Sequence, residues 1–229
     1  MRELLLIRHG QASFSADDYD QLSPVGERQS SMLGEWLATC GPQPDLVAIG
    51  PRVRHRDTAR LCQQTAAVSL QPALLPGLDE VDHNELLTRH RPDLAAPGAI
   101  RAEMKQTADP HRAFQRLFVD AIDRWVSGAH DADYTRTWPA FRADVLQALQ
   151  QLADHPARTI WAFTSGGPIA VIASALLQTP EAQAFQLSWP LVNTGMTRLR
   201  LSSRGAALVT YNAWPHLERT GDARLVTLR

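Results

Sequence analysis

Three short segments of the sequence combine residue types that can bind an anion and act on it. The first is Arg8-His9-Gly10-Gln11. A planar guanidinium matches the geometry of a phosphate or a carboxylate, and an imidazole can act as a nucleophile or a base near neutral pH. Gly10 allows the backbone to turn sharply and to approach a ligand closely. This tetrapeptide therefore predicts an anion site that contains a reactive histidine.

The second segment, Gly50–Ala59, supplies further cations at the start of a predicted helix. Helical spacing puts Arg54 and Thr58 on one face. Arg52 and Arg56 project elsewhere. We expect one arginine of this helix to reach the same anion as the first segment, and the other two to lie on a solvated face.

The third segment, Thr164-Ser165-Gly166-Gly167-Pro168-Ile169, is a turn of small residues that enters a predicted helix. The first turn of a helix has backbone N–H groups without intrahelical partners and carries partial positive charge. Both features favour a phosphate. The segment therefore predicts backbone donors that could face the same anion.

The three segments follow the carboxyl ends of predicted buried strands. Continuous apolar runs, typical of strands in a parallel sheet, occur at residues 4–7, 45–49 and 159–163. We expect helices at residues 23–40, 52–66, 138–152 and after Pro168, and late strands at 187–201 and 207–211. This alternation predicts an α/β fold, a three-layer α/β/α sandwich with a mostly parallel central sheet. In such sheets, ligands bind beyond the carboxyl ends of the strands.

Residues 81–137 differ from the rest of the chain because they are richer in charge and have no strand signal. Their clearest helical pattern covers residues 113–126. We interpret residues 81–137 as a helical cap insertion within a single domain that comprises residues 1–229. The side chains of this cap carry no recognisable code for a particular substrate.

The composition is typical of a globular protein and excludes several classes of function. Of the 229 residues, 44% are hydrophobic and 21% are charged, and the formal net charge is −1. A chain without a strong net charge is not drawn to nucleic acid or to an anionic membrane. No signal peptide is visible, and the two cysteines, Cys40 and Cys62, have no metal-ligand spacing. We expect a cytoplasmic protein with reduced, buried cysteines.

Four motifs, in this order, make the chain resemble the histidine phosphatase superfamily, also called the phosphoglycerate mutase-like family. Arg8-His9-Gly10-Gln11 resembles the opening motif of that family. Leu22-Ser23-Pro24-Val25-Gly26-Glu27-Arg28-Gln29 resembles the helix start that follows it. The segment Gly50–Ala59 is similar to the motif of the second arginine, which the register puts at Arg54. Leu78-Asp79-Glu80 stands where the family carries its acidic proton donor. The resemblance covers most of the chain.

The resemblance implies a phosphatase that acts on a small phosphate monoester without a metal or another cofactor. His9 would attack phosphorus and form a phosphohistidine, while Arg8 and Arg54 would hold the phosphoryl oxygens. Glu80 would protonate the leaving oxygen as a general acid. Glu85 is the alternative acid.

Two positions depart from the family pattern. Ser165 stands where the family carries a second histidine, and Ser15 stands where an asparagine is common. We therefore expect the phosphate contacts at this place to come from the hydroxyl groups of Ser15 and Ser165 and from the backbone N–H of Gly166. A serine hydroxyl donates one neutral hydrogen bond in place of the imidazole, and we consider His83 as a partial substitute.

Two other functions remain open from the sequence. One is a mutase of the phosphoglycerate mutase type, which returns the phosphoryl group to another hydroxyl of the same molecule. The other is a phospho-ligand binding or regulatory protein, catalytically weakened by Ser165. A homodimer is the default expectation for the oligomeric state.

Overall fold

The computed structural model describes residues 2–13 and 20–228. Within this part of the chain, the contacts divide into two compact units. The first unit comprises Met1–Glu80 and Asp144–Arg229, and the second comprises Val81–Ala143. The expected Ser15 lies outside the described residues.

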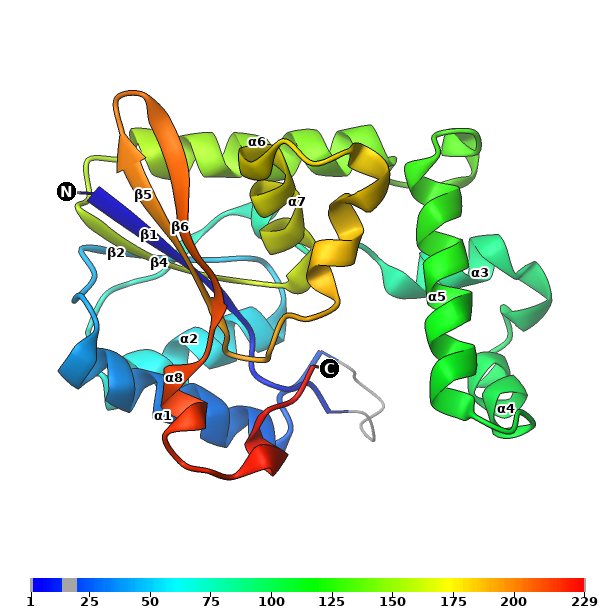
Figure 1. Ribbon diagram of the computed structural model, residues 1–229, viewed down its shortest axis with the longest axis horizontal. Coiled ribbons are helices and arrows are strands. Elements are labelled where there is room, and N and C mark those ends of the chain that lie inside the picture. Colours follow the sequence, from blue (N-terminus) through cyan, green and yellow to red (C-terminus); the bar gives the residue numbers. More distant parts are fainter. Residues whose placement is uncertain (1, 14–19, 229) are drawn as a thin grey trace. The chain divides into compact units, whose positions relative to one another are not determined.

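The first unit is built around a six-stranded sheet (Figure 1). Its strands lie in the order β3-β2-β4-β1-β5-β6 and comprise β1 (Arg2–Arg8), β2 (Leu46–Ile49), β3 (Ala73–Leu74), β4 (Thr159–Thr164), β5 (Met196–Ser202) and β6 (Gly205–Ala213). The first four strands in this order pair in parallel. The last two pairings, β1 with β5 and β5 with β6, are antiparallel. The expected α/β fold with a mostly parallel sheet is confirmed.

The register brings three strand ends to one edge of the sheet. Arg8, the last residue of β1, lies opposite Thr164, the last residue of β4. Ile49 at the end of β2 lies opposite Phe163. The residues that follow these strands are the three segments singled out in the sequence, so they leave the sheet side by side.

Helices cover both faces of this sheet (Figure 1). One face carries α1 (Pro24–Cys40), α2 (Val53–Thr65) and the short α8 (Pro215–Glu218). The other carries α7 (Gly166–Leu177) and the part of α6 (Trp138–Asp154) that belongs to the first unit. The beginning of α1 follows the expected chemistry, because the side chain of Ser23 accepts a hydrogen bond from the Gly26 N–H and Pro24 is the first helical residue.

The sheet and the α1–α2 layer share an apolar core. Strand residues Leu5, Ile7, Val47, Trp161 and Phe163 are fully buried there. The helices contribute Leu33, Leu37, Ala59 and Cys62. Burial on this scale, at roughly 1.5–3 kcal/mol for a large apolar side chain, fixes the strands whose ends carry the polar segments.

The second unit is helical within the residues that the structure describes. It contains α3 (His83–His90), α4 (Ala99–Lys105), α5 (Pro110–Val126), the beginning of α6, and two short 3-10 turns, Pro92–Leu94 and Asp131–Asp133. Its core is aromatic, because the ring of Trp125 lies 5.3 Å from that of Trp138 and 5.5 Å from that of Phe141. No helix among the described residues is long and apolar enough to cross a membrane.

Three expectations about local structure need correction. The helix expected after Pro168 begins at Gly166, so Pro168 occupies the third helical position, where a missing N–H costs nothing. The strand expected at 187–201 is only β5, because the 3-10 helix Glu181–Ser188 and a turn precede it. Cys40 is exposed, whereas Cys62 is buried as expected.

Candidate active site

His9 directly follows β1 and is held as a neutral imidazole. Only 7% of the residue is exposed, and Nδ1 lies 2.7 Å from the carbonyl oxygen of Gly10. A carbonyl oxygen only accepts, so Nδ1 carries the hydrogen and Nε2 carries the lone pair. Burial lowers the pKa of His9 well below its ordinary value, and the positive charges of Arg54 and Arg8 lower it further. The imidazole is therefore unprotonated at neutral pH.

The backbone around His9 is held from several elements. The Gly10 N–H donates to Thr58 Oγ1 at 3.0 Å, and Thr58 Oγ1 donates to the Arg54 carbonyl. Asn193 Nδ2 donates to the carbonyl oxygen of His9 at 3.1 Å. Thr58 and Asn193 are both fully buried. The expected face shared by Arg54 and Thr58 thus connects α2 to the loop that carries His9.

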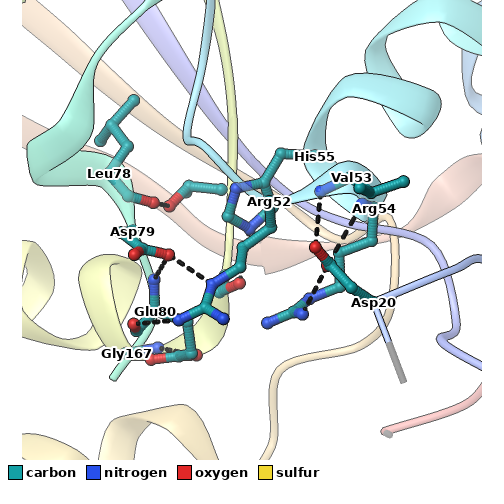
Figure 2. Close-up of polar contacts among 11 residues, drawn as sticks. Asp20, Arg52, Val53, Arg54, His55, Leu78, Asp79, Glu80 and Gly167 are labelled. Carbon is teal, nitrogen blue, oxygen red and sulfur yellow. Dashed lines mark hydrogen bonds and ion pairs between the residues drawn. The ribbon is translucent and has the colours of Figure 1, made fainter. Parts of the chain in front are cut away.

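Arg54 is the buried arginine of α2, as the register predicts. The residue is 6% exposed, and Nη1 donates to Asp20 Oδ1 at 2.8 Å. Asp20 Oδ2 also accepts from the Val53 N–H at 2.8 Å, so this carboxylate caps the start of α2 (Figure 2). The sequence analysis missed Asp20, because its contacts lie 33 residues away along the chain and no local spacing signals them.

Arg8, the last residue of β1, lies near the C-terminal segment. Its Nη1 donates to the carbonyl oxygen of Leu228 at 2.8 Å and also to that of Leu191. The charges of Arg8 and Arg54 both act on the His9 imidazole. The structure therefore brings the two expected arginines to the expected histidine.

The other two arginines of the second segment behave differently from each other. The side chain of Arg56 is 62% exposed, as expected for a solvated face. The expectation for Arg52 is wrong, because its Nε donates to Asp79 Oδ1 at 2.5 Å and its Nη2 donates to the Glu80 carbonyl at 3.1 Å (Figure 2). Arg52 thus connects the start of α2 to the segment Leu78-Asp79-Glu80.

Glu80 follows the 3-10 turn Pro76–Leu78, and its side chain contacts the first turn of α7. It is 6% exposed, and its Oε2 accepts from the Gly167 N–H at 3.1 Å. The backbone of Glu80 is held as well, since its N–H donates to Asp79 Oδ1 at 2.8 Å. Glu85, the alternative acid, belongs to the second unit, where its Oε1 accepts from both the N–H and the hydroxyl of Thr135.

Ser165 follows β4 and precedes α7, and it is fully buried. Its Oγ lies 2.6 Å from Nε2 of His55, which is also fully buried. The ring centroids of His55 and His9 are 5.8 Å apart. The sequence analysis missed His55, although it stands in the second segment directly after Arg54. His83, considered as a substitute, makes an edge contact with Phe118 in the second unit.

The site thus gathers a neutral histidine, two arginines, a carboxylate and a helix start at one edge of the sheet. No group of three or more metal-ligating side chains lies within the described ranges, 2–13 and 20–228. A family model named histidine phosphatase superfamily (branch 1) matches residues 4–213. The chain belongs to the histidine phosphatase superfamily.

Solved structures of superfamily proteins share this fold. A phosphoserine phosphatase mutant from Entamoeba histolytica, in complex with phosphoserine, has a TM-score of 0.64 at 20% identity, covering 95% of this chain and 100% of that one. A phosphoglycerate mutase from Bacillus anthracis has a TM-score of 0.68 at 13% identity, covering 96% and 97%. A mycobacterial glucosyl-3-phosphoglycerate phosphatase, in complex with inorganic phosphate, has a TM-score of 0.59 at 23% identity, covering 94% and 99%. No curated protein matches the chain.

Membership in the histidine phosphatase superfamily assigns the chain to the phosphatases and phosphoryl-transfer enzymes, as its motifs indicate. The identities to the solved structures are low, so these structures support the fold and leave the substrate open.

Proposed function

We propose that the protein is a metal-independent phosphohydrolase that cleaves a small phosphate monoester through a phosphohistidine on His9. The observation that carries this proposal is the hydrogen bond from His9 Nδ1 to the Gly10 carbonyl. It leaves the lone pair of Nε2 available for attack, while the charges of Arg8 and Arg54 act on the same ring. A neutral nucleophile beside two fixed cations suits a phosphoryl group, which carries its negative charge into the transition state.

In the first step, His9 Nε2 forms a bond to phosphorus and the bond between phosphorus and the ester oxygen breaks. The leaving oxygen takes a proton from the carboxyl group of Glu80. In the second step, water attacks phosphorus and the N–P bond breaks. The water proton returns to Glu80, and inorganic phosphate leaves. Arg8 and Arg54 hold the phosphoryl oxygens in both steps, with contacts from Ser165 and the backbone N–H of Gly166.

We also propose that the Val81–Ala143 unit is an insertion within a single phosphatase domain. Both ends of this unit continue into the first unit, and the helix α6 runs without interruption through the boundary between Ala143 and Asp144. The segment Leu78-Asp79-Glu80 ends directly before the insertion.

The test is hydrolysis of p-nitrophenyl phosphate in the presence of EDTA. We expect turnover and an acid-labile phosphoryl label on His9, and we expect both to vanish in His9→Ala. Arg54→Ala should lower kcat/KM by about 100–1000-fold, because a preorganised cation is lost. Arg56→Ala on the same helix is the matched control and should change little.

Other outcomes would favour the alternatives. Phosphate binding without turnover or label would indicate a phospho-ligand binding protein. A stable label with dependence on a bisphosphate primer would indicate a mutase. A label on a residue other than His9 would contradict the proposed mechanism.

A further inference from the structure

One arginine holds the backbone of Glu80 on both sides of its Cα atom. The guanidinium of Arg52 donates from Nε to Asp79 Oδ1 at 2.5 Å and from Nη2 to the carbonyl oxygen of Glu80 at 3.1 Å (Figure 2). The same oxygen, Asp79 Oδ1, accepts from the N–H of Glu80 at 2.8 Å. Arg52 and Asp79 together therefore fix the N–H and the C=O group of the residue proposed as the general acid.

The carboxyl group of Glu80 has a defined position as a result. The residue is 6% exposed, and its Oε2 accepts from the Gly167 N–H at 3.1 Å in the first turn of α7 (Figure 2). Its backbone is fixed by the Arg52–Asp79 pair, and its side chain is buried and bound at the far end. Packing and hydrogen bonds of this kind lock a side chain into one rotamer.

The segment that contains Glu80 is joined to the backbone of His9 by one residue of β4. The His9 N–H donates to the carbonyl oxygen of Thr164 at 2.9 Å, and Thr164 Oγ1 donates to the carbonyl oxygen of Leu78 at 2.7 Å. Thr164 is fully buried, so both hydrogen bonds are shielded from water. The proposed nucleophile and the proposed acid therefore share a support on the sheet.

The helix α2 provides a second connection between the same two segments. Arg52 directly precedes α2, and its carbonyl oxygen accepts from the N–H of Arg56 at 3.2 Å in the first turn. Thr58 Oγ1, farther along the helix, accepts from the Gly10 N–H at 3.0 Å. One end of this short helix thus contacts the Glu80 backbone, and the next turn contacts the loop that carries His9.

The contribution of Arg52 is one of geometry more than of ion-pair energy. The side chains of Arg52 and Asp79 are 32% and 28% exposed, so solvent screens their attraction. Burial opposes the charge of Arg52, but the carboxylates of Asp79, Asp20 and Glu80 outweigh it and raise the pKa of Arg52. A planar guanidinium presents its donors in a rigid fork, which lets one side chain reach two acceptors at once.

We propose that Arg52 and Asp79 are positioning residues that hold the Glu80 carboxyl group at a fixed place relative to His9, so that its proton reaches the leaving oxygen. This inference rests on the proposed function, in which Glu80 is the general acid. The pair acts on the peptide groups beside Glu80. Because a misplacement near 1 Å can cost about 100-fold in rate, losing the pair should slow the reactions that need the proton.

Two aryl phosphates of nearly the same shape test this proposal. Phenyl phosphate needs a proton on its leaving oxygen, whereas p-nitrophenolate leaves readily without one. The readout is the ratio of kcat/KM for p-nitrophenyl phosphate to kcat/KM for phenyl phosphate. Arg52→Ala should raise this ratio by about 10–100-fold over the wild type, because the acid is displaced. A role of Arg52 in binding the phosphate would slow both substrates equally and leave the ratio unchanged.

Conservative variants separate the hydrogen bonds from the charges. Arg52→Lys keeps the positive charge but loses the fork, so the ratio should rise nearly as far as in Arg52→Ala. Asp79→Ala should raise it as well. Asp79→Asn should stay close to the wild type, because its side-chain oxygen can still accept from both Arg52 and the Glu80 N–H. Arg56→Ala, on the exposed side of α2, is the matched control and should leave the ratio unchanged.

A double variant shows whether the effect passes through Glu80. In Glu80→Gln the carboxyl proton is already lost, so the addition of Arg52→Ala should raise the ratio no further. Circular dichroism and thermal unfolding identify any variant that does not fold. If Arg52→Ala is one of these, Arg52→Lys and Asp79→Asn still decide the result, because one should raise the ratio and the other should not.

The outcomes separate this inference from the proposed function. Without an acid-labile label on His9 in the wild type, the proposed function fails and this inference fails with it. If the label forms and Glu80→Gln raises the ratio, but Arg52→Ala and Arg52→Lys do not, only the positioning role is refuted. It is also refuted if Arg52→Ala raises the ratio further in the Glu80→Gln background, since Arg52 would then act on the leaving group by another route.

Discussion

Individual side chains in this site are controlled by burial and by nearby charges. His9 and His55 are both neutral because burial and the surrounding arginines lower their pKa values. The arginines keep carboxylate partners, since Arg54 pairs with Asp20 and Arg52 pairs with Asp79. A substrate phosphate would therefore enter a site whose cations are already oriented by anions.

Glu80→Gln tests the proposed acid through the leaving group. An alkyl phosphate needs a proton on its departing oxygen, whereas p-nitrophenolate departs readily without one. We expect kcat for an alkyl phosphate to fall by about 100–10,000-fold, and kcat for p-nitrophenyl phosphate to fall far less. The measurement is a comparison of the two substrates in one variant. Glu85→Gln, at the alternative acid, is the control and should affect neither. Equal losses on both substrates would show that Glu80 acts in some other way.

Asp20→Asn tests competition for Arg54. The amide can still accept the Val53 N–H at the start of α2, but it no longer neutralises the guanidinium. Inorganic phosphate should inhibit the variant about fivefold more strongly, equivalent to about 1 kcal/mol. The control is Asp57→Asn, which removes the partner of Arg56 on the exposed side of α2. Weaker inhibition in Asp20→Asn would indicate that Asp20 orients Arg54 for phosphate rather than competing with it.

At the scale of elements, the site depends on backbone contacts between α1 and the loop after β1. A Cβ atom added at Gly26 would overlap the carbonyl oxygen of Gln11, and one added at Gly10 would lie 2.5 Å from the Gly26 carbonyl oxygen. The Gln11 N–H also donates to Gln29 Oε1 at 2.9 Å. The first turns of α1 therefore determine where the His9 loop lies.

Gly26→Ala should shift that loop. Overpacking of this kind costs about 1–3 kcal/mol of folding stability, and a displacement near 1 Å at the proposed nucleophile, His9, can cost about 100-fold in rate. Gly34→Ala is the matched control, because it collides with the Thr65 side chain and the Cys62 backbone, away from the site. Both variants should unfold at lower temperature, and only Gly26→Ala should lose kcat when measured below its unfolding transition. Equal activity losses would contradict this role for α1.

The sequence predicted elements best where apolar patterning dominates. The buried runs of β1, β2 and β4 and the capped start of α1 lie where they were expected. The region before β5 was misjudged, because residues 187–195 were expected to form a strand but form the end of a 3-10 helix and turns. The contacts of Arg52 and Asp20 also could not be predicted, since each joins segments about 30 residues apart whose approach depends on the tertiary fold.

His55 was within reach of the sequence, and its case shows why a motif cannot supply every contact. The departure at Ser165 was visible, and His55 stood one residue after Arg54. Their sequence separation of 110 residues hid the relation between them. Only the pairing of β2 with β4 brings the two segments to one edge of the sheet, and that pairing was not predicted in register.

At the scale of the whole molecule, buried neutral histidines tie folding stability to pH. His9, His55 and His216 all have lowered pKa values, and burial is the main cause for each. For His216, whose Nε2 lies 2.8 Å from Thr194 Oγ1, burial lowers the pKa to about 3. In the unfolded chain, a histidine binds a proton with a pKa near 6.5. Acid therefore favours the unfolded state at three positions.

The sign of this effect follows from proton binding. Below about pH 6.5 the unfolded chain binds protons that the folded state does not, so the free energy of unfolding falls as the pH falls. The slope approaches about 1.4 kcal/mol per pH unit for each histidine, until the pH reaches its folded pKa. For His216 alone, this amounts to about 2 kcal/mol between pH 7.5 and pH 5.0.

Urea unfolding at pH 7.5 and pH 5.0 measures the dependence. The wild type should lose stability on acidification, and His216→Gln should lose about 2 kcal/mol less, because its amide does not titrate. His155→Gln is the control at an exposed histidine and should keep the wild-type difference. If His216→Gln shows the same difference between the two pH values as the wild type, His216 takes up no proton on unfolding. In that case, the folded protein must bind a proton at this buried position, which would place a charged imidazole against Thr194.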